Sequence, residues 1–347
     1  MAIIPNSCKF HVVSSTVDTV DRGSAEFQSK RKIFTMADIA ETVDVTVSPY
    51  TIGESNSILP VIPTGGSENT ITGGSACTVI SGGYSNNING SCKATISGGA
   101  INCISLGNSS TIGGGGSNCI TGSSATIAGG INNTASAEGV IGGGRCNTVR
   151  DKSFIGGGCC NVMGGNTAFS VIAGGCSNEI STNLCGHTIG GGMNHEICDG
   201  QYNTIAGGSG NKICTTACDS NFIGGGLSND ITSSAGQYSV VTGGALNDLT
   251  SYSSVISGGL FNDATGCQSV VSGGKSNTAS GTNSAVLGGE GNTSSCGCSF
   301  VVGNGITTDR VCSTFVNNLS IKNIPTSAAG LPSGSVWNNS GVLNIVT

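Results

Sequence analysis

A short phrase built around a Gly-Gly pair recurs along most of this chain. The segment 96–102 is a clean copy, and the pattern reads apolar, x, Gly, Gly, x, x, Asn, x, apolar. We count sixteen copies, and the Asn position holds Asn in fourteen of them, with Cys77 and His195 as the exceptions. A period this regular predicts a solenoid, in which each repeat packs on the next. The first glycines, which are 14 to 18 residues apart from Gly82 onward, are at positions 65, 73, 82, 98, 114, 129, 143, 157, 174, 191, 207, 225, 243, 258, 273 and 288.

The composition supports an ordered repeat rather than an ordinary globular core. The 347 residues include 59 Gly, while 4% are aromatic and 9% are charged, which is far from the usual globular balance. Glycine scattered without a period would indicate a flexible segment. Here glycine stands at a fixed offset from Ile, Val and Asn, so we interpret it as part of the structure.

The charge and the N-terminal segment exclude several classes of partner. The formal net charge is −6, whereas nucleic-acid binding draws its affinity from clustered Lys and Arg. No apolar run reaches the length of a membrane span, and residues 1–13 lack the features of a signal peptide. We therefore expect no nucleic acid, no membrane insertion and no classical export, with synthesis in a cytosol.

The phrase divides the chain into three regions. Residues 64–303 carry the repeats and are expected to form a shaft. Residues 1–63 precede it as an attachment or assembly region, and residues 304–347 follow it as a C-terminal tip. The patterns of the first region predict one amphipathic helix at 35–43 and two strands at 11–20 and 43–51.

The tip is expected to contain a strand and a hairpin. Residues 317–324 predict a strand that ends at Pro325. Residues 334–345 place two apolar segments around an Asn-Asn-Ser-Gly turn, which is a strong hairpin signal. Trp337, the only tryptophan of the chain, lies in this hairpin and is interpreted as a core residue of the tip.

The second strand of each repeat is expected to turn its Asn inward. Side chains in a strand alternate between two faces, so the Asn and the apolar residue two positions later share one face. The residue between them is often charged, as at Glu179 and Asp230, and this outer face is expected to meet water. We interpret the Asn column as a ladder of buried amides that satisfy backbone groups and one another. Its members are Asn86, Asn102, Asn118, Asn133, Asn147, Asn161, Asn178, Asn211, Asn229, Asn247, Asn262, Asn277 and Asn292.

The first strand of each repeat is suited to burial on both faces. Its inner apolar residue directly follows a Thr, Val or Phe, as in Phe154-Ile155. A coil of two short strands is too thin to cover that outer residue, so the first strand needs a partner. The outer residues for which we predict contact with a partner are Val140, Phe154, Val171, Phe222, Val240, Val255 and Val270.

The Gly-Gly pair is expected to form the corner between the two strands. Glycine is required there either for a positive φ or for a close approach between stacked coils. The loop that leads to the next coil varies in length and is expected on one edge of the solenoid, where contact surfaces often form.

The repeat resembles a known family. The segment 276–289, Ser-Asn-Thr-Ala-Ser-Gly-Thr-Asn-Ser-Ala-Val-Leu-Gly-Gly, is similar to the left-handed β-roll repeats of YadA-like trimeric adhesin heads and of related phage and large-virus fibres. The resemblance covers about two thirds of the chain. It implies a parallel homotrimer of rolls, with the outer residues of the first strand at the contact. The fold class we predict is therefore all-β, a solenoid of two-stranded parallel coils.

No arrangement of residues predicts an enzyme, a cofactor or a metal site. The three histidines His11, His187 and His195 are scattered, and no nucleophile stands at a triad-like spacing from them. Residues 273–276 end like a phosphate-binding loop but lack its earlier glycine. Segments 207–211 and 288–292 approach a calcium repeat but lack its Asp. Paired carboxylates that meet on the surface of the roll remain an open alternative.

Eight of the seventeen cysteines fall in pairs at equivalent positions of adjacent coils. Neighbouring strands lie close enough for a disulfide, whereas synthesis in a cytosol favours free thiols. We expect mostly free thiols with a few bridges. The pairs expected to stack are Cys103 with Cys119, Cys146 with Cys160, Cys159 with Cys176, and Cys198 with Cys214.

These patterns together predict a structural protein. The interpretation we favour is a trimeric fibre or spike of a virus or phage, synthesised in the host cytosol and carried on the virion. Its partners would be itself, other virion proteins through residues 1–63, and an unknown host receptor or glycan. Two alternatives stay open, a surface adhesin or extracellular filament subunit of a cell, and a glycan-cleaving tailspike.

Overall fold

The computed structural model describes residues 51–52, 66–73, 75, 77–165, 167–216, 220–232 and 238–347. The chain divides into two units, residues 1–49 and 50–347. The helix and strands expected at 35–43, 11–20 and 43–51 lie outside the described residues, apart from Thr51.

The second strands of the coils form one parallel sheet, which we call sheet A. Each strand has two or three residues and pairs with the equivalent strand of the next coil. In order along the sheet, the strands are β1 (Thr51–Ile52), β2 (Thr70–Thr72), β4 (Asn87–Asn89), β6 (Cys103–Ser105), β8 (Cys119–Ile120), β10 (Thr134–Ala135), β12 (Thr148–Val149), β14 (Val162–Met163), β16 (Glu179–Ile180), β18 (Glu196–Ile197), β20 (Lys212–Ile213), β22 (Asp230–Ile231), β24 (Asp248–Leu249), β26 (Asp263–Ala264), β28 (Thr278–Ala279) and β30 (Thr293–Ser294).

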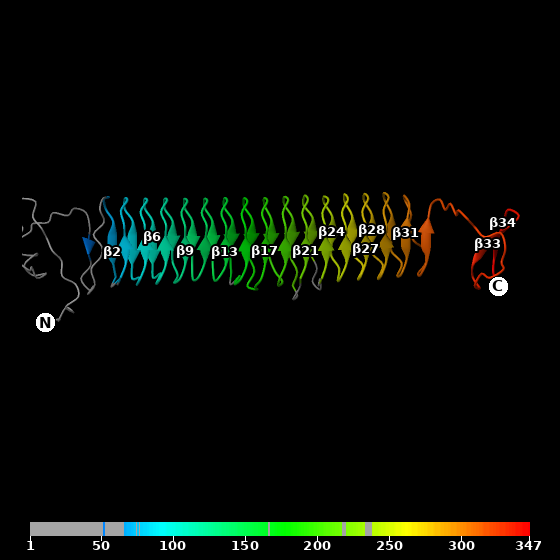
Figure 1. Ribbon diagram of the computed structural model, residues 1–347, viewed down its shortest axis with the longest axis horizontal. Helices are drawn as coiled ribbons and strands as arrows, with labels where there is room; N and C mark the ends of the chain where they lie inside the picture. Colours follow the sequence, from blue (N-terminus) through cyan, green and yellow to red (C-terminus); the bar gives the residue numbers. More distant parts are fainter. Residues whose placement is uncertain are drawn as a thin grey trace, which may run out of the picture. The chain divides into compact units, whose positions relative to one another are not determined.

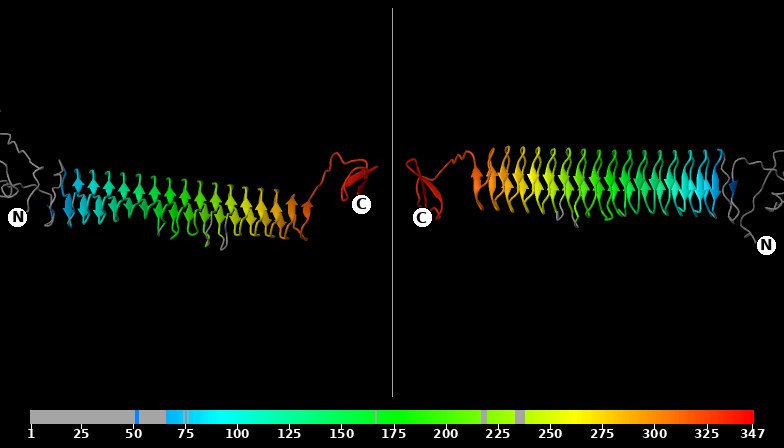
Figure 2. Two further views of the ribbon diagram at one scale, coloured as in Figure 1. Left: turned by 60° about the horizontal axis from the view of Figure 1, so that its bottom comes forward. Right: turned by 180° about the vertical axis from the view of Figure 1, so that it is seen from behind.

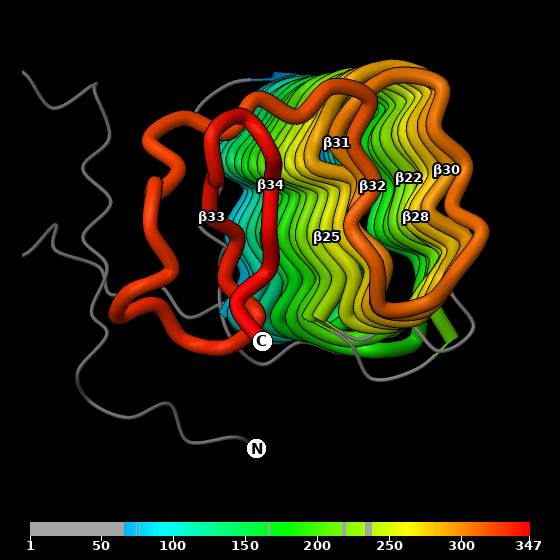
Figure 3. Tube along the Cα trace, turned by 90° about the vertical axis from the view of Figure 1, so that its right-hand side faces the viewer, coloured from blue at the N-terminus to red at the C-terminus, as the bar shows by residue number. Residues whose placement is uncertain are grey.

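The first strands form the other parallel sheet, sheet B, which lies against sheet A (Figure 3). Its strands are β3 (Val79–Ile80), β5 (Thr95–Ile96), β7 (Thr111–Ile112), β9 (Thr126–Ile127), β11 (Val140–Ile141), β13 (Phe154–Ile155), β15 (Val171–Ile172), β17 (Thr188–Ile189), β19 (Thr204–Ile205), β21 (Phe222–Ile223), β23 (Val240–Val241), β25 (Val255–Ile256), β27 (Val270–Val271), β29 (Ala285–Val286), β31 (Phe300–Val302) and β32 (Thr314–Val316).

The two sheets make a parallel β-solenoid of about fifteen turns, which we call the roll (Figure 1). The register advances one coil at a time, so that Val140 pairs with Phe154 and Ile141 with Ile155. No helix occurs among the described residues. The prediction of an all-β solenoid of two-stranded coils is therefore confirmed. The loops of the coils in the middle of the roll, drawn in green, extend beyond the others on one edge (Figure 2).

The core of the roll is a double stack of aliphatic side chains. Each coil contributes one inward residue from sheet B and one from sheet A, as with Ile112 and Ile120, which are both fully buried. Burying a side chain of this size contributes about 1.5–3 kcal/mol. Because the register is parallel, every such residue packs on its equivalents in the coils before and after it.

The two corner glycines are required for different reasons. Gly98 has φ +149° and a free space where a Cβ would lie. Gly99 has φ +87°, and a Cβ there would overlap the backbone oxygen of Gly115 in the next coil. The first glycine thus serves the turn, and the second also serves the close approach of the coils.

One of the sixteen sequence copies is not a coil. The copy that begins at Gly73 falls directly after β2, and β2 pairs with β4. A Cβ at Gly73 would meet Asn89 and Gly90 at the end of β4, so Gly73 lies beside the end of that strand. It stands eight residues after Gly65, which is too short for a turn with two strands. The roll therefore has fifteen Gly-Gly corners in sequence order.

The C-terminal region differs from its prediction in one place. The expected hairpin is present, with β33 (Val336–Asn339) antiparallel to β34 (Val342–Ile345) and Trp337 half-buried within it. The strand expected at 317–324 is wrong, because the strand is β32 at Thr314–Val316. That segment pairs with β31 and completes sheet B. The residues after it have no further coil to pair with.

Candidate functional site: the outer surfaces of the roll

The predicted Asn column lies inside the roll. All thirteen side chains are buried. Asn118 is representative, because its backbone N–H donates to Oδ1 of Asn102 at 3.0 Å and its Nδ2 donates to the carbonyl oxygens of Gly114 and Gly130, both at 2.9 Å. Each amide thus ties its own corner to the coils on both sides. None of these side chains is accessible to a ligand.

His195 takes the place of Asn in its coil. Its N–H donates to Oδ1 of Asn178 at 3.1 Å, and its Nδ1 accepts from the N–H of Asn211 at 3.1 Å. Burial lowers the pKa of His195, so its neutral form continues the ladder as an acceptor.

A second polar column runs along the opposite corner of the roll, and the sequence reading missed it. It lies one residue before the strands of sheet B, and from Ser153 to Ser269 every member is Ser, His or Asn, whereas earlier coils have Ala94, Ala125 and Gly139 at this position. The N–H of His187 donates to Oγ of Ser170 at 3.1 Å, and Oδ1 of Asn203 accepts from the N–H of Asn221 at 3.0 Å. Burial lowers the pKa of His187 to about 4. The signal was a polar residue two positions before every inward residue from Ile155 to Val271, as in Ser170-Val171-Ile172.

The predicted contact residues form one row on the outer face of sheet B. In-register pairing places them in adjacent coils, with two threonines in the middle of the row. Phe154 is 41% exposed, and the others are half-buried. No charged side chain interrupts the row. We call it the apolar stripe, and it consists of Val140, Phe154, Val171, Thr188, Thr204, Phe222, Val240, Val255 and Val270.

Small residues run beside the apolar stripe. Each directly follows the inward residue of its strand, as Gly142 follows Ile141 and Ala173 follows Ile172. A face of Val and Phe flanked by Gly and Ala is flat, and it allows a second backbone to approach closely.

The outer face of sheet A is charged over the same coils. Register pairing stacks a row that we call the charged row, in which Nζ of Lys212 lies 2.9 Å from Oε2 of Glu196. Burial and the charge of Asp248 raise the pKa of Asp230 to about 6, and burial also raises the pKa of Asp248 and of Asp263. The charged row consists of Glu179, Glu196, Lys212, Asp230, Asp248 and Asp263.

The expectation that this face simply meets water is wrong for its aspartates. Asp230, Asp248 and Asp263 are each half-buried, because stacked side chains cover one another at the spacing of a β-ladder, about 4.8 Å. Oδ1 of Asp230 and of Asp248 is buried without a hydrogen-bond partner among the described residues. These carboxylates are therefore only partly hydrated.

The structure brings the predicted cysteine pairs together. Cys103 and Cys119 are register partners in sheet A, and Cys159 pairs with Cys176 at the Gly-Gly corner. Cys198 and Cys214 form a disulfide with their Cα atoms 5.0 Å apart. Thirteen of the described cysteines are free.

The thiols of Cys103 and Cys119 influence one another. Their hydrogen bond lowers the pKa of Cys119 to about 7 and raises the pKa of Cys103. The first of the two thiols to ionise is therefore Cys119, with the Cys103 thiol as the donor to its thiolate.

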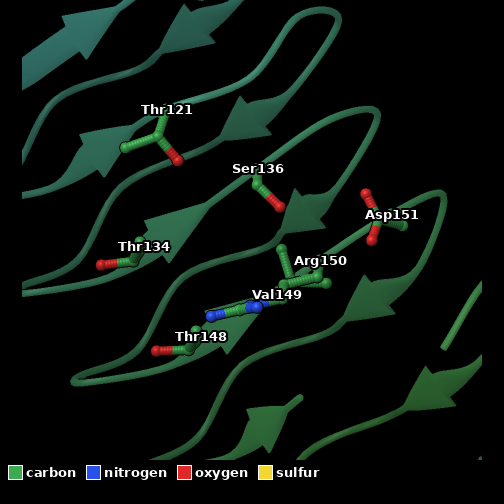
Figure 4. Close-up of a pocket in the computed structure, with 7 residues that line it drawn as sticks. All are labelled: Thr121, Thr134, Ser136, Thr148, Val149, Arg150 and Asp151. Atoms are coloured by element: carbon green, nitrogen blue, oxygen red, sulfur yellow. The ribbon is translucent and has the colours of Figure 1, made fainter. Parts of the chain in front are cut away.

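A shallow depression of about 290 Å³ lies at the edge of sheet A. It contains one carboxylate, from Asp151, and one guanidinium, from Arg150, so no pair of carboxylates suited to sugar hydrolysis lines it. Among the described residues, one group has the spacing of metal ligands, Glu196 with Cys198 and Cys214, and its two sulfurs are joined to one another. The residues lining the depression are Thr121, Thr134, Ser136, Thr148, Val149, Arg150 and Asp151 (Figure 4).

No protein-family model matches the chain, and no curated protein sequence is similar to it. In the part of the chain that the structure describes, there is no helix that could cross a membrane. The outer surfaces of the roll are therefore the basis for a functional assignment.

Proposed function

We propose that the protein is a structural fibre or spike subunit of a virus or phage particle, and that its roll associates as a parallel homotrimer through the apolar stripe. The observation that carries this proposal is the stripe itself. It extends over nine consecutive coils of sheet B without a charged side chain.

The interior of the roll supports a rigid, passive role. The Asn column and, from Ser153 to Ser269, the second polar column are buried and hydrogen-bonded from coil to coil, and the core between them is a stack of mostly aliphatic side chains. Because every coil of such a roll stacks in register on the next, outward residues of similar polarity form one long, straight surface. A long surface suits lateral assembly with copies of the same chain.

The energetics favour association through the stripe. Each buried Val or Phe contributes about 1.5–3 kcal/mol, and the row repeats this contribution coil after coil. The cost of association in translational and rotational freedom is incurred only once for a rigid rod, however many coils make contact. In a parallel association, equivalent coils of the copies lie at the same level, so Phe154 and Phe222 of one copy lie level with those of the others.

The number of copies and the viral setting come from the resemblance to YadA-like heads and to phage and large-virus fibres. In such an assembly, three stripes would meet at the axis, and the charged rows of sheet A would face outward. Residues 1–63 would attach the fibre to other virion proteins.

The experiment that tests this assembly compares the two faces. Val171→Asp with Phe222→Asp places two carboxylates in the stripe, and sedimentation is expected to show monomers. Thr148→Asp, on the outer face of sheet A, is the matched control and is expected to leave the trimer intact. A trimer that survives both stripe substitutions would exclude the stripe as the contact.

A gentler variant separates assembly from folding. Val171→Thr with Phe222→Thr is compatible with the coil, because Thr188 and Thr204 occupy the same row. We expect this variant to keep the β-sheet circular dichroism of the wild type. Its trimer is expected to dissociate at protein concentrations at which the wild-type trimer is still intact. Mass spectrometry of purified virions then tests the setting, since the chain would be absent from particles if it were a cellular adhesin.

A further inference from the structure

The loop edge of the roll carries a row of exposed aromatic rings. At this edge, opposite the Gly-Gly corner, the residue before each member of the second polar column points outward. In three coils it is aromatic, and Phe169, Tyr202 and Tyr238 are 69%, 58% and 63% exposed. Their φ angles of 60°, 53° and 56° are nearly equal. The three rings therefore leave the edge from equivalent backbone positions.

The three rings are two coils apart. The N–H of Val171 donates to the carbonyl of His187, and the N–H of Thr188 donates to that of Asn203, at 2.8 and 3.0 Å. The same bonds continue from Thr204 to Asn221 and from Phe222 to Ser239, at 2.9 and 3.0 Å. Each bond is one coil step of about 4.8 Å, so the backbone positions that carry the rings repeat at about 9.6 Å.

The coils between the aromatic ones carry small residues at this position. Gly186 stands between Phe169 and Tyr202, and Ser220 stands between Tyr202 and Tyr238. A Cβ on Gly186 would overlap the ring carbons of Tyr202. The Tyr202 ring therefore lies over Gly186, against the edge, and presents a face to solvent.

The charges near these rings do not suit a polyanion. Lys152, in the coil before Phe169, has its Nζ 3.8 Å from Oε1 of Glu138. Asp151 and Asp199 lie on the same edge. Single-stranded nucleic acid also stacks on aromatic rings, but it requires a basic groove for its backbone. The ligand that fits is neutral, with flat apolar faces and hydroxyl groups.

We propose that Phe169, Tyr202 and Tyr238 form a binding surface for an extended, β-linked hexose polymer of the cellulose or chitin type. The C–H face of a pyranose stacks on an aromatic ring, and tyrosine hydroxyls donate to and accept from sugar hydroxyls. In these polymers each sugar is turned over relative to the last. Every second sugar therefore presents the same face, and the length of two sugars is close to that of two coils.

This inference rests on the proposed function in one respect. A fibre would meet a surface outside the particle, and the polymer would be its ligand on that surface. Three weak stacking sites on one rigid edge act together, because binding at the first ring holds the polymer beside the others. A trimer would carry three such edges.

The test is co-sedimentation of the full chain with insoluble cellulose and with insoluble chitin. Starch granules, whose α-linked chains coil, are the polymer control. Wild type is expected to bind at least one β-linked polymer. Whether it binds cellulose or chitin identifies the source of the ligand. Phe169→Ala, Tyr202→Ala and Tyr238→Ala together are expected to weaken binding at least tenfold. Phe261→Ala, which removes a 50% exposed ring at the Gly-Gly corner, is expected to leave binding unchanged.

A second variant tests the spacing and keeps the composition. Gly186→Tyr with Tyr202→Gly moves the middle ring by one coil, so the rings stand one and three coils apart, and we expect binding to weaken several-fold. Tyr202→Phe keeps the ring and is expected to retain most of the binding. Absence of binding to both β-linked polymers, wild-type binding by the triple variant, or equal binding to starch would overturn the inference.

The outcomes separate this inference from the proposed function. Sedimentation of the same samples without polymer reports the trimer. A trimer that binds neither polymer overturns the glycan surface and leaves the fibre in place. A monomer that binds overturns the trimeric fibre and leaves the aromatic surface.

Discussion

The outer faces of sheets A and B come from the same coils and have opposite characters. On sheet B, Val140 to Val270 form an uncharged row, while on sheet A the same coils carry Glu179 to Asp263. The inner positions of both sheets are mostly aliphatic, with Met163 and Ser294 as exceptions on sheet A. The interior therefore specifies the fold, and the single outward position of each strand is free to specify what the roll contacts. The difference between the two outer rows is the reason for our proposal that copies of the chain associate through sheet B.

The largest expected loss of stability comes from a substitution in the buried Asn column, which supports both sheets at once. Asn118→Leu leaves the carbonyl of Gly114 and the N–H of Asn133 without the partner they have now, while the carbonyl of Gly130 keeps the N–H of Gly116. Each buried unsatisfied group costs about 1–3 kcal/mol, so we expect destabilisation of roughly 2 kcal/mol or more. Thermal unfolding followed by circular dichroism measures it.

The control for that change lies close by. Asn132 is exposed and precedes the buried Asn133. Asn132→Ser places there the residue that Ser117 supplies in the preceding coil, so the melting temperature should hardly move. Equal destabilisation by Asn118→Leu and Asn132→Ser would contradict the ladder.

A smaller effect on stability is expected from sheet A alone, and this effect depends on pH. The pKa of Asp230 is raised to about 6 in the folded chain, above its ordinary value near 4. The folded state thus binds more protons between these values. The contribution of Asp230 to stability is therefore greatest at low pH and is lost as the pH rises through about 6.

The variant for this effect is Asp230→Asn. We expect it to stabilise the roll at pH 7.5 by about 1 kcal/mol, because partial exposure screens the charge, and to have no such effect at pH 4. Denaturant unfolding at the two pH values measures the difference. Glu179→Gln, at the exposed end of the charged row, serves as the control and should change little at either pH.

The smallest effect concerns the thiols, which also distinguish the two faces. Cys103, Cys119, Cys198 and Cys214 stand on or directly after strands of sheet A, whereas no strand of sheet B contains cysteine. Thiol labelling of unfolded, non-reduced protein is expected to modify at least the thirteen described free cysteines. Labelling of fewer than half of the seventeen would instead indicate a roll that is cross-linked by disulfides beyond sheet A.

The sequence predicted the repeated parts of the structure best. The Asn column and the inward Ile residues recur with one residue type at one offset, so a single pattern defined both the coil and its inner face. The second polar column escaped notice because Ser170, His187 and Asn203 perform the same hydrogen bonding with different side chains. Only the stacking of coils shows that these residues are equivalent.

Other features depend on neighbours that a linear pattern does not contain. The segment 317–324 has the composition of a strand, yet the last rung of sheet B is filled by Thr314–Val316. The Gly73 pair matches the phrase, yet it lies within a coil. The partial burial of Asp230 and Asp248 follows from the distance between rungs. The aromatic row on the loop edge likewise needed the coils to be aligned in space.

The central claim is that the apolar stripe of sheet B is covered by copies of the same chain. Native mass spectrometry of the full chain at micromolar concentration tests it most directly. The account predicts a single assembly of three times 34.1 kDa. A mass of 34.1 kDa at every concentration tested would contradict it.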